Sequence, residues 1–182
     1  MADLDGRTIA FLATDGFEDS ELTSPWEAVT AAGARAVLVS PGTGTISGKN
    51  GHEATVDETT ADSDPARFDG LVLPGGVVNA DHVRMDEGAV AFAKHFFEAG
   101  KPVGVICHGA WILTDADVLR GRTLTSYSSL QTDLRNAGAT WVDEEVHVDQ
   151  GLVSSRTPED LPAFNAKVVE EFAEGRHEGQ RA

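Results

Sequence analysis

The chain has 182 residues, 41% of them hydrophobic, and this length suits one domain with a single core. Its 30 acidic side chains outnumber 14 basic ones, and the net charge of −16 repels nucleic-acid phosphates and anionic lipids. This excess fits an ordinary acidic protein or one adapted to high internal salt. No apolar run approaches the ~18 residues of a membrane-spanning helix. Residues 1–13 lack the features of an export signal, so we expect a cytoplasmic protein.

Four apolar runs predict buried strands, and helical patterns or turns follow them. The runs are TIAFLA (8–13), RAVLVS (35–40), GLVLPGG (70–76) and PVGVIC (102–107). Strands that alternate with helices in this way predict a mostly parallel sheet with helices on both faces. The glycine-rich segment 40–51 lacks the order of a phosphate-binding loop, and we expect a surface loop and hairpin there.

Local signals mark the ends of several helices. Ser24, Pro25 and Glu27 form a capping box that predicts a helix start at Ser24. A second helix is expected from about Asp86 to Glu98, with Gly100 as its stop.

The last third of the chain predicts a hairpin and a closing helix. Residues 145–156 alternate with a period of two around Gln150-Gly151, which predicts an antiparallel hairpin, and 157–175 form a helix capped by Thr157. We assign residues 1–175 to a single domain and 176–182 to a polar tail that we expect to fray.

Cys107 is the only cysteine, and it lies at the carboxyl end of a predicted strand, directly before His-Gly. Ligands of α/β sheets bind at the carboxyl ends of the strands. A sharp strand-to-helix turn exposes a nucleophile there, and the helix N-terminus favours the thiolate. A lone cysteine is more commonly a small buried apolar residue. The position of Cys107 favours a nucleophile.

Five motifs in order carry a resemblance to a known family. They are DGFEDSEL (15–22), LVLPGG (71–76), VICHG (105–109), LRGRTLTSY (119–127) and NAGATWVDEEVHVDQGLVSSR (136–156). Over residues 7–173 the chain resembles the PfpI family, the C56 intracellular peptidase group, which includes proteins described as deglycases. This family belongs to the superfamily resembling type 1 glutamine amidotransferases. The resemblance implies a flavodoxin-like three-layer α/β sandwich.

The same resemblance implies a set of catalytic residues. It makes Cys107 the nucleophile, His108 its partner and Glu18 the acid beside the thiol. Because an ionised carboxylate would raise the pKa of a neighbouring thiol, we expect Glu18 to be protonated and to donate to the sulfur. In similar proteins an acidic residue from a neighbouring subunit orients the histidine, and Asp81 is the matching position here. A homo-oligomer, a dimer or higher, is therefore expected.

Gly75 and Gly76 follow a predicted buried strand, and their amides could form an oxyanion hole with that of His108, as the resemblance implies. The alternative is a tight turn that merely requires glycine. His147 shares a strand face with Asp149 and is a rival base, although we expect it to be a solvated hairpin residue. The elbow lacks the first glycine of the Gly-x-Cys-x-Gly motif, which counts against glutaminase activity.

No cofactor is expected. The remaining histidines show no metal-ligand spacing, and no nucleotide-binding motif is present; these histidines are His52, His82, His95 and His177. The leading hypothesis is a cysteine-dependent hydrolase with deglycase or glyoxalase-type activity on glyoxal or methylglyoxal adducts. The alternatives are an intracellular cysteine peptidase and a non-catalytic redox sensor or chaperone in which Cys107 is oxidised.

Overall fold

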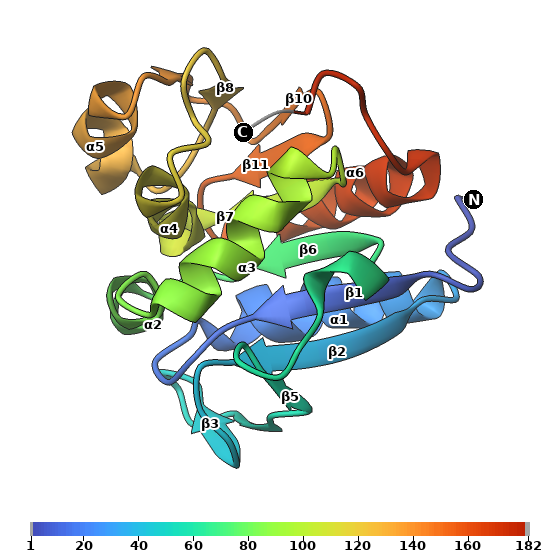
Figure 1. The fold of residues 1–182 in the computed structure, drawn as a ribbon. Coiled ribbons are helices and arrows are strands. Elements are labelled where there is room, and N and C mark those ends of the chain that lie inside the picture. The colour runs from blue at the N-terminus through green and yellow to red at the C-terminus, as the bar shows by residue number, and fades with distance from the viewer. Residues whose placement is uncertain (1, 181–182) are drawn as a thin grey trace.

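A seven-stranded sheet forms the centre of the computed structural model, which describes residues 2–180 (Figure 1). The strand order is β10-β11-β7-β6-β1-β2-β5, and every neighbouring pair is parallel except β10 and β11. Their bounds are β1 (Thr8–Leu12), β2 (Arg35–Ser40), β5 (Glu58–Thr59), β6 (Gly70–Leu73), β7 (Val103–Ile106), β10 (Val146–Asp149) and β11 (Leu152–Ser155). The predicted mostly parallel sheet is confirmed.

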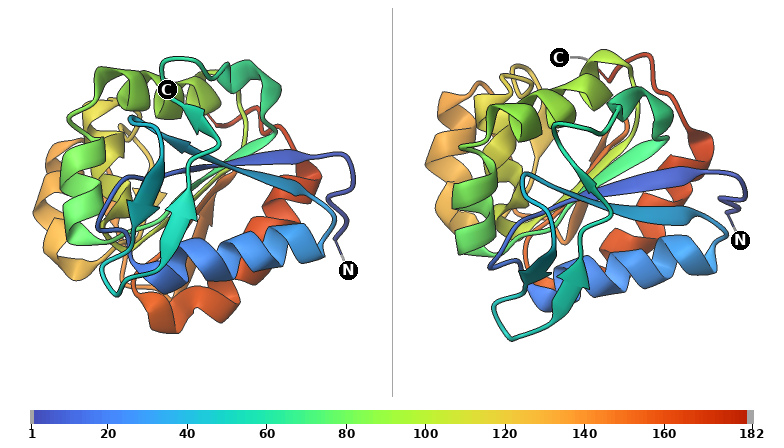
Figure 2. Two further views of the ribbon diagram at one scale, coloured as in Figure 1. Left: turned by 90° about the horizontal axis from the view of Figure 1, so that it is seen from below. Right: turned by 60° about the horizontal axis from the view of Figure 1, so that its bottom comes forward.

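Helices cover both faces of the sheet. On one face α1 (Asp19–Ala31) packs beside α6 (Leu161–Glu174), and Figure 2 shows these two helices side by side. On the other face lie α3 (Glu87–Glu98) and α4 (Trp111–Asp115), with α2 (Val77–Val83) and α5 (Gln131–Asn136) at its side. No helix within residues 2–180 is long and apolar enough to cross a membrane. The three-layer α/β architecture agrees with the fold that the sequence predicts.

Alternate side chains of the strands enter two separate cores. Ala10 and Leu12 of β1 pack under α3 and α4, whereas Ile9 and Phe11 pack under α1 and α6. Successive strand residues point to opposite faces, so an interior strand of a three-layer sandwich has to be apolar on both sides. This requirement explains the continuous apolar runs in the sequence.

Two small sheets and the predicted hairpins complete the fold. β3 (Thr45–Ser47) pairs with β4 (Glu53–Thr55), and β8 (Thr123–Leu124) pairs with β9 (Thr140–Trp141). The antiparallel pair of β10 and β11 turns at Gln150 and Gly151, both with positive φ. The hairpins expected within the segments 40–51 and 145–156 are thus present, the first extending to Thr55.

The first helix does not begin where its capping box predicts. α1 starts at Asp19 and contains Pro25 in its interior, and Ser24 is not its N-cap. Glu21 and Leu22 are buried in the added first turn. Their burial against the rest of the fold outweighs the hydrogen bond that Pro25 cannot donate, so the prediction of a start at Ser24 is wrong. The helix α3 has the bounds that the sequence predicts within one residue, and Asp86 is its N-cap.

The closing helix and the tail differ in part from expectation. Residues 158–160 form a 3₁₀ turn before α6. The described part of the tail, 176–180, is packed rather than frayed, because the side chain of Gln180 donates to the Lys101 carbonyl at 3.0 Å and accepts from Arg122 at 2.7 Å. Residues 181–182 lie outside the described residues, and the domain boundary at residue 175 stays a prediction.

A matched pair of valine substitutions tests this packing. Val168 of α6 is fully buried above Gly104 of β7, whereas Val78 of α2 is 51% exposed. We expect Val168→Ala to lower the free energy of unfolding by about 1.5–3 kcal/mol, because two methyl groups leave the core. Val78→Ala should change it by less than about 0.5 kcal/mol when both variants are compared as dissociated monomers. Guanidinium denaturation measures the free energy of unfolding of both variants. Equal losses of stability in the two variants would contradict the packing of α6 on the sheet.

Candidate active site

A pocket of about 550 Å³ opens at the carboxyl edge of the sheet. The strands β1, β6, β7 and β11 run parallel, so the segments that follow them converge there. These segments, the loop at Lys49 and the segment after β8 line the pocket with Glu18, Glu21, Lys49, Gly76, Val77, Cys107, His108, Tyr127, Thr157, Pro158 and Glu159.

Cys107 forms the sharp elbow that its sequence position predicts. It follows β7 directly, opens a 3₁₀ turn over Cys107–Ala110 and has a φ of 60°, which is a strained left-handed conformation for a non-glycine residue. Gly109 permits the turn, because a Cβ there would lie 2.9 Å from the carbonyl oxygen of Pro74. Cys107 is 8% exposed and lines the pocket.

The acid beside the thiol is Glu21, not Glu18. Glu21 is fully buried in the first turn of α1, where its carboxyl group interacts with the thiol of Cys107 and accepts a hydrogen bond from the Gly75 amide at 2.8 Å. Glu18 and Glu21 are three residues apart and would share a face inside a helix. Glu18, however, is the N-cap residue that precedes the first turn of α1, so only Glu21 lies within that turn. The expected contact between Glu18 and the sulfur is therefore wrong, and the role predicted for it belongs to Glu21.

The pKa values of Glu21 and Cys107 are both raised. Burial, followed in effect by the nearby charge of Glu18, raises the pKa of Glu21 to about 8. Burial and then the charge of Glu21 raise the pKa of Cys107 to about 12, although the amides of His108 and Gly76 act in the opposite direction. The effect of these amides on the pKa of Cys107 is thus smaller than the effect of burial. The sequence led us to expect that the helix N-terminus would favour the thiolate, and in the structure the thiol form is favoured instead. At neutral pH Glu21 holds its proton and can donate it to the sulfur.

His108 is positioned to accept the thiol proton. Its Nδ1 lies 3.3 Å from the sulfur of Cys107, and its Nε2 lies 3.2 Å from the hydroxyl oxygen of Ser129. The ring stacks on Tyr127 with centroids 4.6 Å apart. Burial and the charge of Lys49 lower the pKa of His108, so the ring is neutral at pH 7. With its hydrogen on Nε2, Nδ1 is free to act as a base.

The two glycines of the PGG segment have different roles. The amides of Gly76 and His108 both act to lower the pKa of the Cys107 thiol, so they favour negative charge at the sulfur. The Gly75 amide is occupied by Glu21, so Gly75 is not a free donor. Its hydrogen side chain is nevertheless required, because a Cβ there would lie 2.8 Å from the Cβ of Cys107. Gly76 has a φ of +90°, which favours glycine.

Glu18 and Lys49 form an ion pair at one side of the pocket. Glu18 is nearly buried, and Lys49 arrives from the loop between β3 and β4. The pair brings a cation near both the thiol and His108, since Lys49 interacts electrostatically with both groups.

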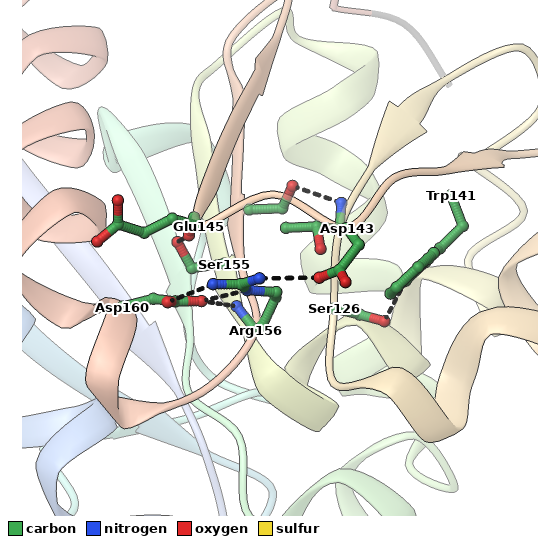
Figure 3. Close-up of polar contacts among 9 residues, drawn as sticks. Ser126, Trp141, Asp143, Glu145, Ser155, Arg156 and Asp160 are labelled. Carbon is green, nitrogen blue, oxygen red and sulfur yellow. Dashed lines mark hydrogen bonds and ion pairs between the residues drawn. The ribbon is translucent and has the colours of Figure 1, made fainter.

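An arginine network flanks the segment 157–159, which lines one wall of the pocket (Figure 3). The Arg156 guanidinium lies between Asp160 and Asp143, with N–O distances of 2.9 and 2.8 Å. Nearby, Ser155 donates to the Glu145 carbonyl at 2.7 Å. Arg156 and Asp160 flank the residues 157–159 that line the pocket, so the network fixes the path of this wall.

The structure leaves two other predicted residues outside this constellation. Asp81 is exposed on α2, and within one chain Ser129 rather than Asp81 contacts the imidazole of His108. His147 is on β10, where it pairs with Glu144 at 2.8 Å. It does not line the pocket, so it is not a rival base.

Among the side chains that sequence reasoning missed, four bear on the thiol and the imidazole: Glu21, Lys49, Tyr127 and Ser129. Glu21 and Tyr127 lie in the motifs at 15–22 and 119–127, but the predicted helix start at Ser24 left Glu21 outside the helix and without a signal. Lys49 and Ser129 come from loops that only tertiary folding brings to the thiol.

A cysteine at a strand-to-helix elbow, with a buried acid and a histidine, defines a class of α/β proteins with a candidate thiol nucleophile. The profile of the DJ-1/PfpI family matches residues 7–171, and the chain belongs to this family.

Two curated proteins and one solved structure illustrate the similarity. The chain is 46% identical to "Protein/nucleic acid deglycase 2" of Escherichia coli K12, over 90% of this chain and 96% of that protein. It is 45% identical to "Putative cysteine protease YraA" of Bacillus subtilis, over 87% and 94% of the two chains. The crystal structure of Drosophila melanogaster DJ-1beta superposes with a TM-score of 0.85 at 24% identity, over 92% and 90% of the chains, which shows the shared fold.

The pH dependence of alkylation tests the assignment of Glu21. Above pH 8 the ionised Glu21 raises the pKa of Cys107, whereas glutamine is uncharged at every pH and can still donate to the sulfur. We expect Glu21→Gln to lower the midpoint of iodoacetamide labelling by about one pH unit or more. Mass spectrometry measures the labelled fraction at each pH without ambiguity, because Cys107 is the only thiol.

Glu18→Gln is the matched control, since it removes a carboxylate from the same pocket. Its effect on the labelling midpoint should be clearly smaller, because Glu18 pairs with Lys49 rather than the thiol. If Glu18→Gln shifted the labelling midpoint more than Glu21→Gln, then Glu18 rather than Glu21 would be the acid that interacts with the thiol.

Proposed function

We propose that the chain is a cysteine-dependent hydrolase that removes early glyoxal or methylglyoxal adducts from proteins, or converts the aldehydes themselves. The observation that carries the proposal is the arrangement at Cys107. The sulfur lines a pocket and lies 3.3 Å from Nδ1 of the neutral His108, and the amides of Gly76 and His108 favour its negative charge. The deglycase name of the relative from Escherichia coli supports the substrate class.

The first step follows from this geometry. The thiol proton moves to Nδ1 of His108, the sulfur forms a bond with the carbonyl carbon, and the π electrons move to the carbonyl oxygen. The amides of Gly76 and His108 hydrogen-bond to that oxygen, and Glu21 keeps its proton, so no second negative charge opposes the thiolate. In a glycated substrate the C–N bond breaks and the amine leaves with a proton, so that the sulfur stays bound to the same carbon as a hemithioacetal. A proton then moves from that carbon to the neighbouring carbonyl carbon, which oxidises the first carbon to a thioester and reduces the second to an alcohol. One water hydrolyses the thioester, which releases a 2-hydroxy acid and restores the thiol.

The openness and the lining of the pocket suit adducts that are attached to the side chains of other proteins. It is open to solvent, and its walls combine the aromatic Tyr127 with the charged Lys49 and Glu159. A small carbonyl adduct on an exposed side chain can therefore reach the sulfur without unfolding of its carrier. Peptidase activity is the second candidate, favoured by the protease name of the relative from Bacillus subtilis. A cytoplasmic location and the redox-sensor role stay predictions.

Activity of Cys107→Ala tests the proposal. We expect release of lactate from freshly methylglyoxal-treated albumin by the wild-type chain, and a fall to the uncatalysed background in Cys107→Ala, because the nucleophile is gone. Ser47→Ala, which also deletes one side-chain heavy atom but lies on exposed β3, should keep wild-type rates.

The same variants separate the two candidates. Cleavage of denatured casein that survives ultrafiltration and disappears in Cys107→Ala, without lactate release, would establish the peptidase instead. Lactate release that persists in Cys107→Ala would remove Cys107 from the mechanism.

We also propose that the chain assembles into a homo-oligomer in which Asp81 approaches the site of a neighbouring subunit. Val77 and Val78 on α2 and Met85 just beyond it are large apolar side chains exposed to solvent, and they flank Asp81 in the sequence. Val77 also lines the pocket, so an apolar surface extends from the site toward Asp81.

Mixed oligomers test this arrangement. Asp81→Asn and Cys107→Ala chains should each be inactive alone. In a mixed dimer, the Asp81→Asn chain has an intact Cys107 and receives Asp81 from its partner. Random mixing makes half of the dimers mixed with one competent site each, so activity should return to about a quarter of the wild-type value. Full activity of Asp81→Asn alone, or no recovery on mixing, would contradict the shared site.

A further inference from the structure

A second cluster of polar side chains lies at the carboxyl end of α6, among residues that do not line the pocket of Cys107. It comprises Glu171, Glu174 and His177, which are three residues apart in the sequence. The helix ends at Glu174, and Gly175, with a φ of +85°, turns the chain. This turn brings the imidazole of His177 back to the two carboxylates, with one ligand atom from each residue within 4.8 Å of the others.

The spacing of these atoms suits a single small cation. Nε2 of His177 lies 3.2 Å from Oε2 of Glu171 and 4.0 Å from Oε2 of Glu174. Two ligand atoms in a tetrahedral shell of radius ~2.1 Å lie about 3.4 Å apart. The distance from His177 to Glu171 already matches this value. The side chain of Glu174 is 57% exposed, so a small rotation can shorten its distance to His177.

Two buried atoms of the cluster lack hydrogen-bond partners. Glu171 is 93% buried, and among residues 2–180 neither its Oε2 nor Nε2 of His177 has a hydrogen bond, although the two atoms face each other. They contact each other at 3.2 Å, and a buried carboxylate oxygen and imidazole nitrogen without hydrogen bonds cost free energy. A cation between them would satisfy both atoms.

The backbone holds His177 in place before any ligand arrives. Its amide donates to the Gly100 carbonyl at 2.8 Å, and its carbonyl accepts from the Gln180 amide at 3.1 Å. Gly151 lies against the ring, where a Cβ would approach Cδ2 to 2.7 Å. The carboxyl end of a helix also carries partial negative charge, which favours a cation there.

We propose that Glu171, Glu174 and His177 form a binding site for a divalent transition-metal ion of the Zn²⁺ type. Carboxylate oxygen and imidazole nitrogen are ligands that Zn²⁺ accepts, and water can complete the shell on the exposed side of Glu174. The ion would join residues 175–180 to α6 and stabilise the folded chain. The site is independent of the proposed hydrolase activity.

Calorimetric titration of the full chain with Zn²⁺ tests the site. Cys107→Ala serves as the reference chain, because it removes the one thiolate that could compete for zinc. We expect one ion per chain and a higher melting temperature in excess Zn²⁺. Adding Glu171→Gln or His177→Gln should weaken binding by at least the ~10-fold that loss of an outer-shell partner costs.

Two matched controls keep the test specific. Glu170→Gln removes a neighbouring carboxylate of α6 that pairs with Lys167, and His147→Gln removes a histidine that pairs with Glu144. Both should bind Zn²⁺ like the reference chain. Glu174→Gln changes an exposed residue without risk to folding and should also weaken binding. Absence of stoichiometric binding, or equal losses in the controls, would overturn the proposal.

Discussion

The contact between the Cys107 thiol and the buried carboxyl group of Glu21 constrains the whole carboxyl edge of the sheet. It requires α1 to begin early enough to bury Glu21, and it requires glycine at position 75, where a side chain would collide with both groups. A buried acid beside a buried thiol is tolerable only while one of them keeps a proton. The raised pKa of Glu21 supplies that proton at neutral pH.

The rest of the site is arranged around this pair. His108 can approach the sulfur although it is adjacent in sequence, because the left-handed backbone of Cys107 turns the two side chains toward one another. Cores on both faces of the sheet hold β7 rigidly, so the strain at Cys107 is supported by packing. Charges near the thiol are paired within the pocket walls, as Glu18 with Lys49 and Arg156 with Asp160.

The sequence predicted the fold well, because apolar runs buried on both faces have few other solutions than interior parallel strands. It also located the nucleophile, since a lone cysteine between such a run and His-Gly occupies a recognisable corner. The sequence assigned the acid beside the thiol to Glu18 instead of Glu21. Both residues lie in one motif, and the choice between them depends on the residue at which α1 begins. The local capping signal at Ser24 placed that start too late, since it carried no information on the burial of Leu22.

The sequence by itself determined the layers of the fold, the elbow and the glycines near it, because these follow from periodicity and from backbone geometry within a few residues. Tertiary structure decided which carboxyl group meets the sulfur, which hydroxyl meets His108, and that His177 returns to Glu171. Each of these contacts joins side chains from different segments or across a chain reversal. Their distances depend on the packing of α1, α6 and the loops, which no local pattern encodes.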